Sequence, residues 1–445
     1  MQSQGTGLYF PRLEKASSQM RIGLYCYEYA PEYRVGGRRW RLFADRLCAE
    51  GHDLLLRAKS PKSVTAPARP APFANATWLP LPTQPRYPWL DNWFDQFTWR
   101  WRLGAIWSQA TMKGNTLEEV RFLATTVRRI VREDLAKEQL HWIIVSLPPF
   151  HWAKVIAEEV RIHNARHPDR QRVRLMFDYR DAWSENALLL PELNAARRAV
   201  ESRNEQAALQ QADAVVCVNE QDLAVRQALW RRGGGQAKRA PHFAVIPNGV
   251  HLPSAPPKHL SAADKHTLSM LFAGWIYPPG QPIFTRFISA LLDAWMQRHP
   301  SGNVRLCVAG TWPGALLQTL REMPDLHLDE LGYITHDEVQ SHLKTVDFAV
   351  SFVSDEVGHA VNTKILEAAS HGTPLAVLTN EGAVSAFVRE NGLGVVLPHN
   401  LSSGVTDLID WKTQQRTTGP WTSLQGRHGL AANSDKLLDL LRQGS

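Results

Sequence analysis

Residues 361–377 read VNTKILEAASHGTPLAV, and this order of residue types predicts a short helix followed by a buried strand. Asn362 or Thr363 can cap the helix, because a short polar side chain accepts hydrogen bonds from the first unpaired backbone N–H groups. A glycine and then a proline suit its end. Glu367 therefore lies early in a helix whose amino terminus favours anions. Such a carboxylate can help to hold a phosphate and a sugar hydroxyl together, although the helix dipole alone also favours glutamate there.

Around this stretch, apolar strands and helices alternate over residues 268–404. Strands are predicted at Ser269–Ala273, Val304–Ala309, Leu326–Glu330, Phe348–Phe352 and Leu375–Leu378. Helices are predicted at Phe284–Arg298, Ala315–Glu322, His336–Lys344 and Thr363–His371. The alternation favours a mostly parallel sheet with helices on both faces, and such a sheet binds ligands beyond the carboxyl ends of its strands.

The first part of the chain, residues 20–251, shows the same alternation. Strands are predicted at Met20–Cys26, Leu140–Val145, Arg172–Phe177 and Ala214–Val218, and helices at Leu117–Lys137, Phe150–Asn164 and Leu193–Gln211. After the first strand, a loop that ends with the glycine pair precedes RRWRLFADRLCAEGHDLLL (38–56), which reads as a helix, a glycine stop and a second strand. The segment Ser60–Asn75 reads as a surface loop by its composition. We therefore expect an α/β protein with two domains, at residues 20–251 and 268–404.

Three further segments lie outside these two domains. Residues 1–19 lack the apolar core of a secretory signal, and we expect a disordered tail or a true start at Met20. Residues 252–267 are rich in Pro, Ser and Ala and read as a linker. Residues 405–445 contain a segment, Ser434–Arg442, that is apolar at helical spacing, and we expect this helix to return toward the first domain.

Composition sets broad limits on function. The chain of 445 residues is 44% hydrophobic and 21% charged, as is ordinary for a globular protein, and no apolar run approaches the length of a membrane span. Its 4 cysteines are scattered without metal-ligand spacing, which predicts reduced thiols and a cytoplasmic protein. The net charge of +7 fits nucleotide phosphates, an acidic membrane surface or nucleic acid. No recognised nucleic-acid-binding module accompanies this charge, so we expect no nucleic-acid partner.

Several motifs follow one another in the order that they have in a known family. They include PEYRVGGRR (31–39), SLPPFHWAKVIA (146–157), FDYRDAW (177–183), VIPNGV (245–250), MLFAGWIYPPGQP (270–282), NTKILEAASHGTPL (362–375) and NEGAVSAFVRENGLGVVL (380–397). Together they resemble retaining glycosyltransferase family 4 over roughly residues 20–400. The resemblance implies the GT-B fold, in which two Rossmann-like domains face each other across a cleft.

The resemblance also implies a donor site for a nucleotide-diphosphate sugar, which is a substrate, so that no cofactor is expected. The donor-binding positions would be Gly36, Gly37, Gly274, Arg286, His359, Lys364 and Glu367. The glycines would let the backbone approach the donor, Lys364 would be a phosphate cation, and Glu367 would accept hydrogen bonds from the ribose hydroxyls. A plain turn at the glycine pair and a solvated Lys364 are the alternative readings.

Two positions depart from the family pattern. Many members carry a glutamate eight residues before the one that Glu367 matches, whereas this chain has His359 there and Glu356 further back. Many members also carry Arg and Lys after the first strand of the second domain, whereas GWIYPPGQP contains no basic residue. Neutralisation of the phosphates would then fall to Arg286, Lys364 and backbone N–H groups.

His151 is the catalytic candidate in the first domain. It follows a predicted strand end, where an imidazole can hydrogen-bond the sugar or the acceptor hydroxyl, and a capping or packed histidine is the alternative. Arg180 and Asp181 could form a buried ion pair that shapes the acceptor side. Retaining members are generally thought to use the leaving diphosphate to help deprotonate the acceptor. No D-x-D motif stands in a suitable place, so we expect metal independence and no metal-binding residue.

Residues 85–107, PRYPWLDNWFDQFTWRWRLGAIW, combine tryptophan with arginine. Trp99, Arg100 and Trp101 are candidates for the acceptor side. This composition suits peripheral contact with an acidic membrane, a sugar-stacking surface or a protein contact. Packing of a helical insertion is an equally good explanation.

These observations predict a hexosyltransferase-type glycosyltransferase of the cytoplasm or the inner face of the cell membrane. It would move a sugar, with retention, from a nucleotide-sugar donor to a glycan or lipid-linked acceptor in polysaccharide or glycoconjugate biosynthesis. One alternative is a GT-B sugar-nucleotide epimerase or hydrolase. Another is a catalytically inactive nucleotide-sugar-binding subunit, which the missing first glutamate would allow.

Overall fold

The computed structural model describes residues 19–27, 29, 35–59, 76–81, 124–185, 195–235, 239–257, 266–413 and 421–443. The chain forms two compact units, one of Met1–Ile246 with Ser434–Ser445 and one of Pro247–Asn433, and each is described by itself. The predicted tail before Gln19, the loop Ser60–Asn75 and the tryptophan- and arginine-rich residues 85–107 lie outside the described residues.

The first unit contains a seven-stranded parallel sheet in the order β3-β2-β1-β4-β5-β6-β7. Its strands are β1 (Arg21–Tyr25), β2 (Asp53–Lys59), β3 (Ala76–Leu81), β4 (Trp142–Leu147), β5 (Arg174–Tyr179), β6 (Ala214–Cys217) and β7 (His242–Val245). Its helices are α1 (Val35–Ala49), α4 (Ala124–Lys137), α5 (His151–Arg166), α6 (Ala195–Leu209) and α7 (Glu220–Arg232). The central strands are fully buried, because helices cover both faces of a doubly wound sheet.

The second unit contains a six-stranded parallel sheet in the order β10-β9-β8-β11-β12-β13. Its strands are β8 (Thr267–Ala273), β9 (Asn303–Ala309), β10 (Leu326–Gly332), β11 (Phe348–Phe352), β12 (Leu375–Leu378) and β13 (Gly394–Leu397). Its helical segments are η3 (Pro278–Gly280), α8 (Gln281–Arg298), α9 (Gly314–Arg321), α10 (His336–Leu343), η4 (Asp355–Val357), α11 (Thr363–Ser370), α12 (Ala383–Glu390), α13 (Val405–Thr413) and α14 (Trp421–His428).

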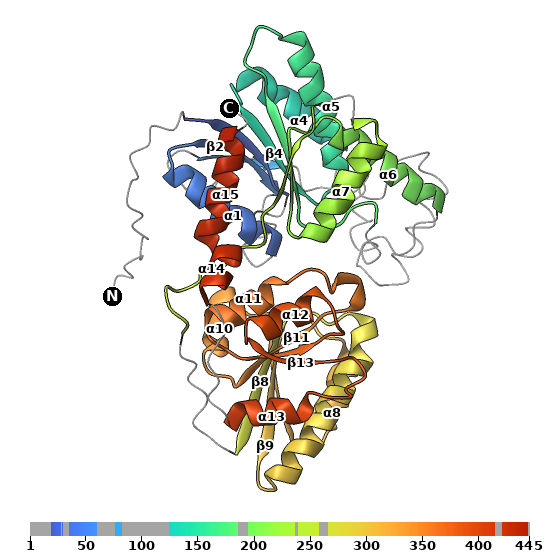
Figure 1. Ribbon diagram of the computed structural model, residues 1–445, viewed down its shortest axis with the longest axis vertical. Coiled ribbons are helices and arrows are strands. Elements are labelled where there is room, and N and C mark those ends of the chain that lie inside the picture. Colours follow the sequence, from blue (N-terminus) through green and yellow to red (C-terminus); the bar gives the residue numbers. More distant parts are fainter. Residues whose placement is uncertain are drawn as a thin grey trace. The chain divides into compact units, whose positions relative to one another are not determined.

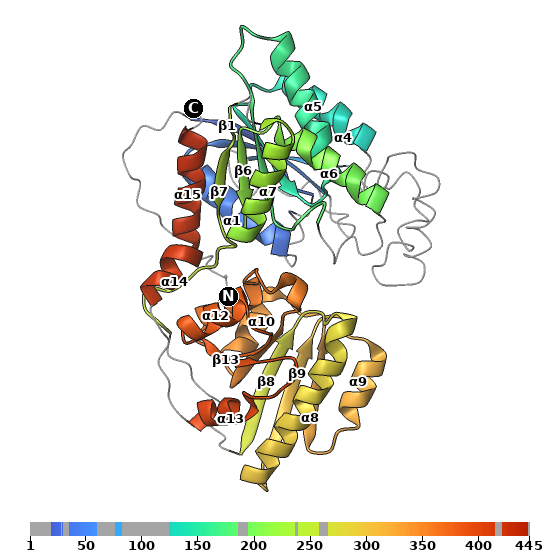
Figure 2. The ribbon, with the colours of Figure 1, turned by 45° about the vertical axis from the view of Figure 1, so that its right-hand side comes forward.

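Two hydrophobic cores lie on the two faces of the second sheet. One core packs α8, α9 and α13 against the sheet, and the other packs α10, α11 and α12. Figures 1 and 2 show α8 running along the β8–β9 side of this sheet. All six strands are parallel, but successive strands are added toward one edge from β8 to β10 and toward the other edge from β11 to β13. Because crossovers between parallel strands are right-handed, this change of direction places the helices on opposite faces.

Helix α15 (Leu430–Gln443) carries the chain from the second unit back into the first. Figure 1 shows it beside α1, and two ion pairs join the helices. Arg46 lies 3.3 Å from Asp435, and Arg442 lies 3.5 Å from Glu50. The apolar segment that the sequence predicted as a terminal helix therefore packs on the first sheet's own helices.

The structure contains the predicted strands and helices within the described residues, with ends that move by a few positions. Two strands at the sides of the first sheet, β3 and β7, were not predicted. Strand β7 has 4 residues and is only partly buried along its whole length, so it lacks the continuous apolar run by which a buried parallel strand is recognised.

Candidate functional site

The segment that opened the sequence analysis forms α11 as predicted. The side chain of Asn362 caps it by accepting a hydrogen bond of 3.1 Å from the backbone N–H of Ile365. The helix ends at Ser370, and Gly372 follows with φ +72°. Its apolar face is buried, whereas the side chains of Lys364 and Glu367 are only partly buried.

Lys364 lies against the backbone of Gly274, which directly follows the carboxyl end of β8. A Cβ atom built on Gly274 would lie 2.2 Å from the Lys364 Nζ, and Gly274 has φ +128°. The same Nζ lies 5.5 Å from the centre of the Phe272 ring. Glycine is required here both by the backbone conformation and by the space that the ammonium group occupies. The structure thus brings together two predicted donor-binding residues that are far apart in sequence.

The surroundings of the Lys364 ammonium suit an anion. Burial lowers its pKa, and the charge of Glu367, one helical turn further on, opposes this shift. Among the described residues, no side chain or carbonyl accepts a hydrogen bond from it, and no carboxylate lies within ion-pair distance. An ammonium group that is removed from water and contacts an aromatic ring is stabilised further by an anionic ligand.

Three glycines line the carboxyl ends of β8, β9 and β10. Gly274, Gly310 and Gly332 all have positive φ, at 128°, 105° and 62°. Their backbones are joined in series, since the N–H of Gly274 donates to Ala309 and the N–H of Gly310 donates to Gly332. The absence of side chains at these three positions lets a flat ligand group approach the backbone.

Tyr333 directly follows this row of glycines, and the sequence analysis did not single it out. It is 67% exposed, which is unusual for a large aromatic side chain. The motif LDELGYITH contained the signal, because an aromatic residue after a glycine at a strand end stands at the ligand-binding edge of a parallel sheet. Phe272 was missed for a different reason, since only the fold shows that its ring faces Lys364.

Arg286 and His359 lie at the same edge of the sheet without touching Lys364. Arg286 is exposed on α8 and donates a hydrogen bond of 3.3 Å to the carbonyl of His399. The His399 ring in turn stacks on Phe352, the last residue of β11. His359 is partly buried in the turn between η4 and α11. Both residues therefore lie near strand ends, and the hydrogen bond of Arg286 is made to a protein carbonyl.

A hollow of about 710 Å³ in the second unit lies elsewhere. Thr267, Asn303 and Leu326 line it, and these are the first residues of β8, β9 and β10. It therefore opens at the amino ends of the strands, opposite to Lys364. Since parallel sheets bind ligands at the carboxyl ends, we do not assign this hollow to the candidate site.

In the first unit, the glycine pair is part of a helix. Helix α1 begins at Val35, so Gly36 and Gly37 lie in its first turn. The sequence had instead predicted them in a loop before the helix. Arg39 and Trp40, one turn further on, both bind Asp178, and these contacts hold the start of the helix in place. The first turn of α1 itself contains no acidic side chain.

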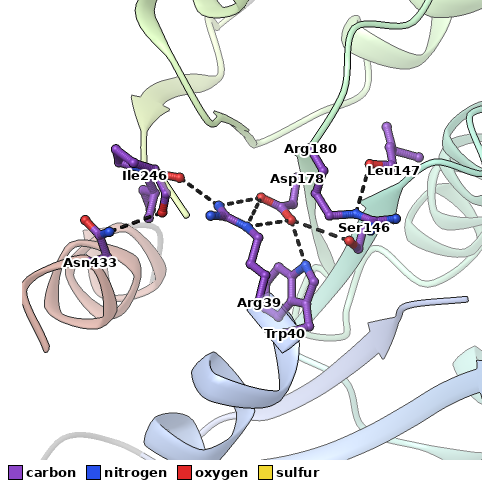
Figure 3. A network of polar contacts seen from close by, with 9 residues as sticks. Arg39, Trp40, Ser146, Leu147, Asp178, Arg180, Ile246 and Asn433 are labelled. Atoms are coloured by element: carbon purple, nitrogen blue, oxygen red, sulfur yellow. Dashed lines mark hydrogen bonds and ion pairs between the residues drawn. The ribbon is translucent and has the colours of Figure 1, made fainter. Parts of the chain in front are cut away.

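The FDYRDAW motif supplies a buried ion pair, but with other residues than predicted. Asp181 is exposed, and Arg180 donates hydrogen bonds of 3.2 and 2.9 Å to the carbonyls of Leu147 and Pro148. The buried pair is Arg39 with Asp178, at 2.8 Å. Figure 3 shows Arg39 and Trp40 converging on Asp178 from α1. The prediction failed because the partner of the carboxylate comes from a distant helix.

His151 is the first residue of α5 and is only 3% exposed. Burial lowers its pKa to about 3, so the imidazole is neutral at pH 7. Its chain neighbours Phe150 and Trp152 belong to the hydrophobic core. A neutral imidazole can act as a hydrogen-bond donor or acceptor, and burial beside core residues is also expected of a packed histidine.

Three further predictions concern the acceptor side, metal binding and the membrane. Trp99, Arg100 and Trp101 lie outside the described residues. In the part of the chain that is described, no three His, Cys, Asp or Glu side chains are grouped so as to hold a metal ion. No helix among the described residues has the length and apolar character to cross a membrane.

Solved structures of similar fold show what this architecture is. No protein-family model matches the chain, and no curated protein matches its sequence. α,α-Trehalose-6-phosphate synthase from Burkholderia multivorans matches with a TM-score of 0.57 at 12% identity, covering 96% of this chain and 99% of that one. The N-terminal domain of Candida albicans trehalose-6-phosphate phosphatase matches at 0.60 and 12%, covering 98% and 99%. The chain has the GT-B fold.

A third match extends the range of proteins with this fold. The catalytic domain of starch synthase IV from Arabidopsis thaliana, solved with ADP and acarbose, matches with a TM-score of 0.55 at 11% identity, covering 96% of this chain and 99% of that one. At such identities the likeness concerns the fold alone. The two Rossmann-like domains of the sequence analysis are thereby confirmed, and the activity has to be argued from the residues.

Proposed function

We propose that the protein is a glycosyltransferase that uses a nucleotide-sugar donor. The observation that carries this proposal is the Lys364 ammonium, which lies desolvated against Gly274 and Phe272 at the carboxyl end of β8. A diphosphate is the anion that best suits a lysine at this edge of a Rossmann-like sheet. The fold supports the same function, since its matches include synthases that form glycosides.

The other donor contacts are proposed from the resemblance and from position. Glu367 lies one turn after Lys364 on α11 and would accept hydrogen bonds from the two ribose hydroxyls. Tyr333 would offer its exposed ring to the nucleobase across the row of glycines. Gly36 and Gly37 would approach the diphosphate and the transferred sugar with backbone N–H groups. Arg286 and His359 would contribute at the outer phosphate and the sugar.

We further propose the chemistry that the sequence predicted. The enzyme would be a retaining hexosyltransferase that acts without a metal ion, with the leaving diphosphate helping to remove the proton of the acceptor hydroxyl. His151 would orient the sugar or the acceptor as a neutral hydrogen-bonding group. The acceptor would be a glycan or a lipid-linked sugar in polysaccharide or glycoconjugate biosynthesis, at the cytoplasmic side of a membrane.

Calorimetric titration with UDP, ADP, GDP and dTDP and their glucose derivatives tests this proposal. We expect one nucleotide family to bind, and Lys364→Met to weaken its binding about 10- to 100-fold, the scale of a lost charged hydrogen bond. Lys344→Met is the matched control, because Lys344 is an exposed lysine that follows α10. Chelation of divalent metals should leave binding and turnover unchanged.

The outcomes separate the proposed function from its alternatives. Transfer of the sugar to an added acceptor with retained anomeric configuration supports the transferase. Donor hydrolysis or epimerisation without acceptor supports a sugar-nucleotide epimerase or hydrolase. Binding without any turnover supports an inactive subunit, and no binding of any nucleotide or nucleotide sugar would overturn the proposal as a whole.

A further inference from the structure

Asp178 is the centre of a buried network in the first unit. Its Oδ2 accepts a hydrogen bond of 2.6 Å from the indole N–H of Trp40, and its Oδ1 accepts one of 2.8 Å from Nη2 of Arg39. The Nε–H of Arg39 points at both carboxylate oxygens, each at 3.2 Å. The Asp178 and Arg39 side chains are 1% and 2% exposed. Two buried charges of this kind are held only by such a nearly complete set of hydrogen bonds.

The same guanidinium reaches a third element. Nη2 of Arg39 also donates a hydrogen bond of 2.8 Å to the carbonyl oxygen of Ile246, just after β7. Arg39 therefore joins α1, β5 and the chain that leaves β7, as Figure 3 shows. Because its donors are fixed in one plane, a movement of any of the three elements changes the hydrogen bonds to the other two.

Ile246 is the residue at which the chain leaves the first unit. The next residue, Pro247, begins the second unit, and its carbonyl accepts a hydrogen bond of 3.1 Å from the side chain of Asn433, the last residue of that unit. Two successive carbonyls are thus held by different units, the first by Arg39 and the second by Asn433.

We propose that Asp178 is a positioning residue for donor binding. Through Trp40 and Arg39 it holds the first turn of α1, where Gly36 and Gly37 lie, and through the same Arg39 it ties that turn to the Ile246–Pro247 link. The idea rests on the proposed function, in which the glycine turn contacts the donor. A donor that orders the first turn of α1 would then also order the Ile246–Pro247 link. Without the charge of Asp178, ordering of the turn would no longer order the link.

The first test needs no ligand. Hydrogen exchange is followed at the amides of Val35–Trp40 and of Ile246, Asn248 and Gly249 in the wild type, in Asp178→Asn and in Arg39→Lys. Asparagine keeps the shape of Asp178 but removes its charge, and lysine keeps the charge of Arg39 but lacks the planar fork of donors that reaches Asp178 and the Ile246 carbonyl together. We expect exchange to rise about tenfold or more in both segments together.

Asp134→Asn is the matched control for a buried ion pair in the same unit. Asp134 pairs with Arg57 and accepts a hydrogen bond of 2.6 Å from Tyr25, away from α1 and the link. We expect both Asp134→Asn and Asp178→Asn to lower the melting temperature. Only Asp178→Asn should raise exchange in the two segments. Exchange that rises in one segment alone, or equally in the control, overturns the inference whatever the protein binds.

The second test uses the nucleoside diphosphate among UDP, ADP and GDP that binds the wild type. We expect the bound nucleotide to slow exchange at both segments in the wild type and in Asp134→Asn. In Asp178→Asn, we expect it to slow exchange at the first turn of α1 but not at the link. In turnover, Asp178→Asn should raise the donor KM about tenfold while kcat falls less. An unchanged KM, or ligand protection of the link that survives in Asp178→Asn, overturns the inference, whereas a wild type that binds no nucleotide overturns the proposed function.

Discussion

The ammonium group of Lys364 occupies the space in which any side chain at position 274 would begin. Nothing in the spacing of these residues along the chain shows this relationship, which arises because α11 follows β11, the neighbour of β8 in the sheet. The contact places a cation from a helix start at the carboxyl end of the central strand. If Lys364 binds the donor as proposed, the glycine of the GWIY motif is needed to leave room for its ammonium group.

Gly274→Ala should therefore weaken donor binding without unfolding the protein. The methyl group would meet Lys364 Nζ at 2.2 Å, and the flexible lysine would move away, at the added cost of an alanine at φ +128°. We expect roughly a tenfold loss of affinity, measured by calorimetry. Gly314→Ala is the control, because no atom lies within 4 Å of its Cβ position. Equal donor affinity in both variants would contradict the assignment.

Glu367→Ala should weaken donor binding by roughly 1.5–3 kcal/mol, the scale of hydrogen bonds to a charged group. It should also lower the pKa of Lys364 further, because Glu367 is the charge that raises it. Calorimetry of the nucleotide over a range of pH measures both effects. Glu390→Ala, an exposed glutamate at the end of α12, is the control. Full affinity in a folded Glu367→Ala protein would remove the ribose assignment.

Acid should destabilise the protein partly through buried histidines. Burial lowers the pKa of His151 to about 3 and also lowers that of His52. The folded state then binds fewer protons than the unfolded state, so the stability that these groups contribute is complete above about pH 6.5 and is lost as the pH falls toward the folded pKa. Each such group lowers the free energy of unfolding by up to about 1.4 kcal/mol per pH unit in that window.

Urea unfolding of the wild type and of His151→Gln between pH 4 and 8 measures this effect. The variant should show a shallower loss of stability below pH 6.5 than the wild type. Asp45 acts in the opposite direction, because burial raises its pKa to about 6, so the comparison is made between proteins at each pH. Parallel curves for the wild type and His151→Gln would show that the imidazole is not buried in solution.

The tryptophan- and arginine-rich residues 85–107 remain a prediction from sequence. If they bind an acidic bilayer, then replacing Trp99 and Trp101 by Ser, or Arg100 and Arg102 by Glu, should release the protein from anionic liposomes and leave donor binding intact. Each arginine near such a surface contributes about 1 kcal/mol, which salt screens, and the tryptophans contribute the part that salt does not remove.

Liposome sedimentation beside thermal melting distinguishes binding from packing. If the tryptophans are core residues, the Ser variant should lose several kcal/mol of stability. A wild type that does not sediment, together with a collapsed melting temperature of the Ser variant, would leave packing as the only explanation.

The sequence by itself determined the α/β class, the two parallel sheets, and the helix that carries Lys364 and Glu367. It could do so because buried parallel strands such as β4, β11 and β12 are continuous apolar runs, and because caps such as Asn362 are read from neighbouring residues. These signals are local, since each depends on residues within one turn or one strand. They fail where burial is partial, as in β7.

Only the tertiary structure decided which distant residues meet. The motif FDYRDAW predicted a pair of Arg180 with Asp181, whereas the fold joined Asp178 to Arg39, 139 positions away. The row of glycines before Tyr333 and the contact of Lys364 with Gly274 likewise depend on the order of strands in the sheet. The physical reason is that a buried charge takes the partner that packing brings within reach, and packing is set by the whole sheet and not by sequence neighbours.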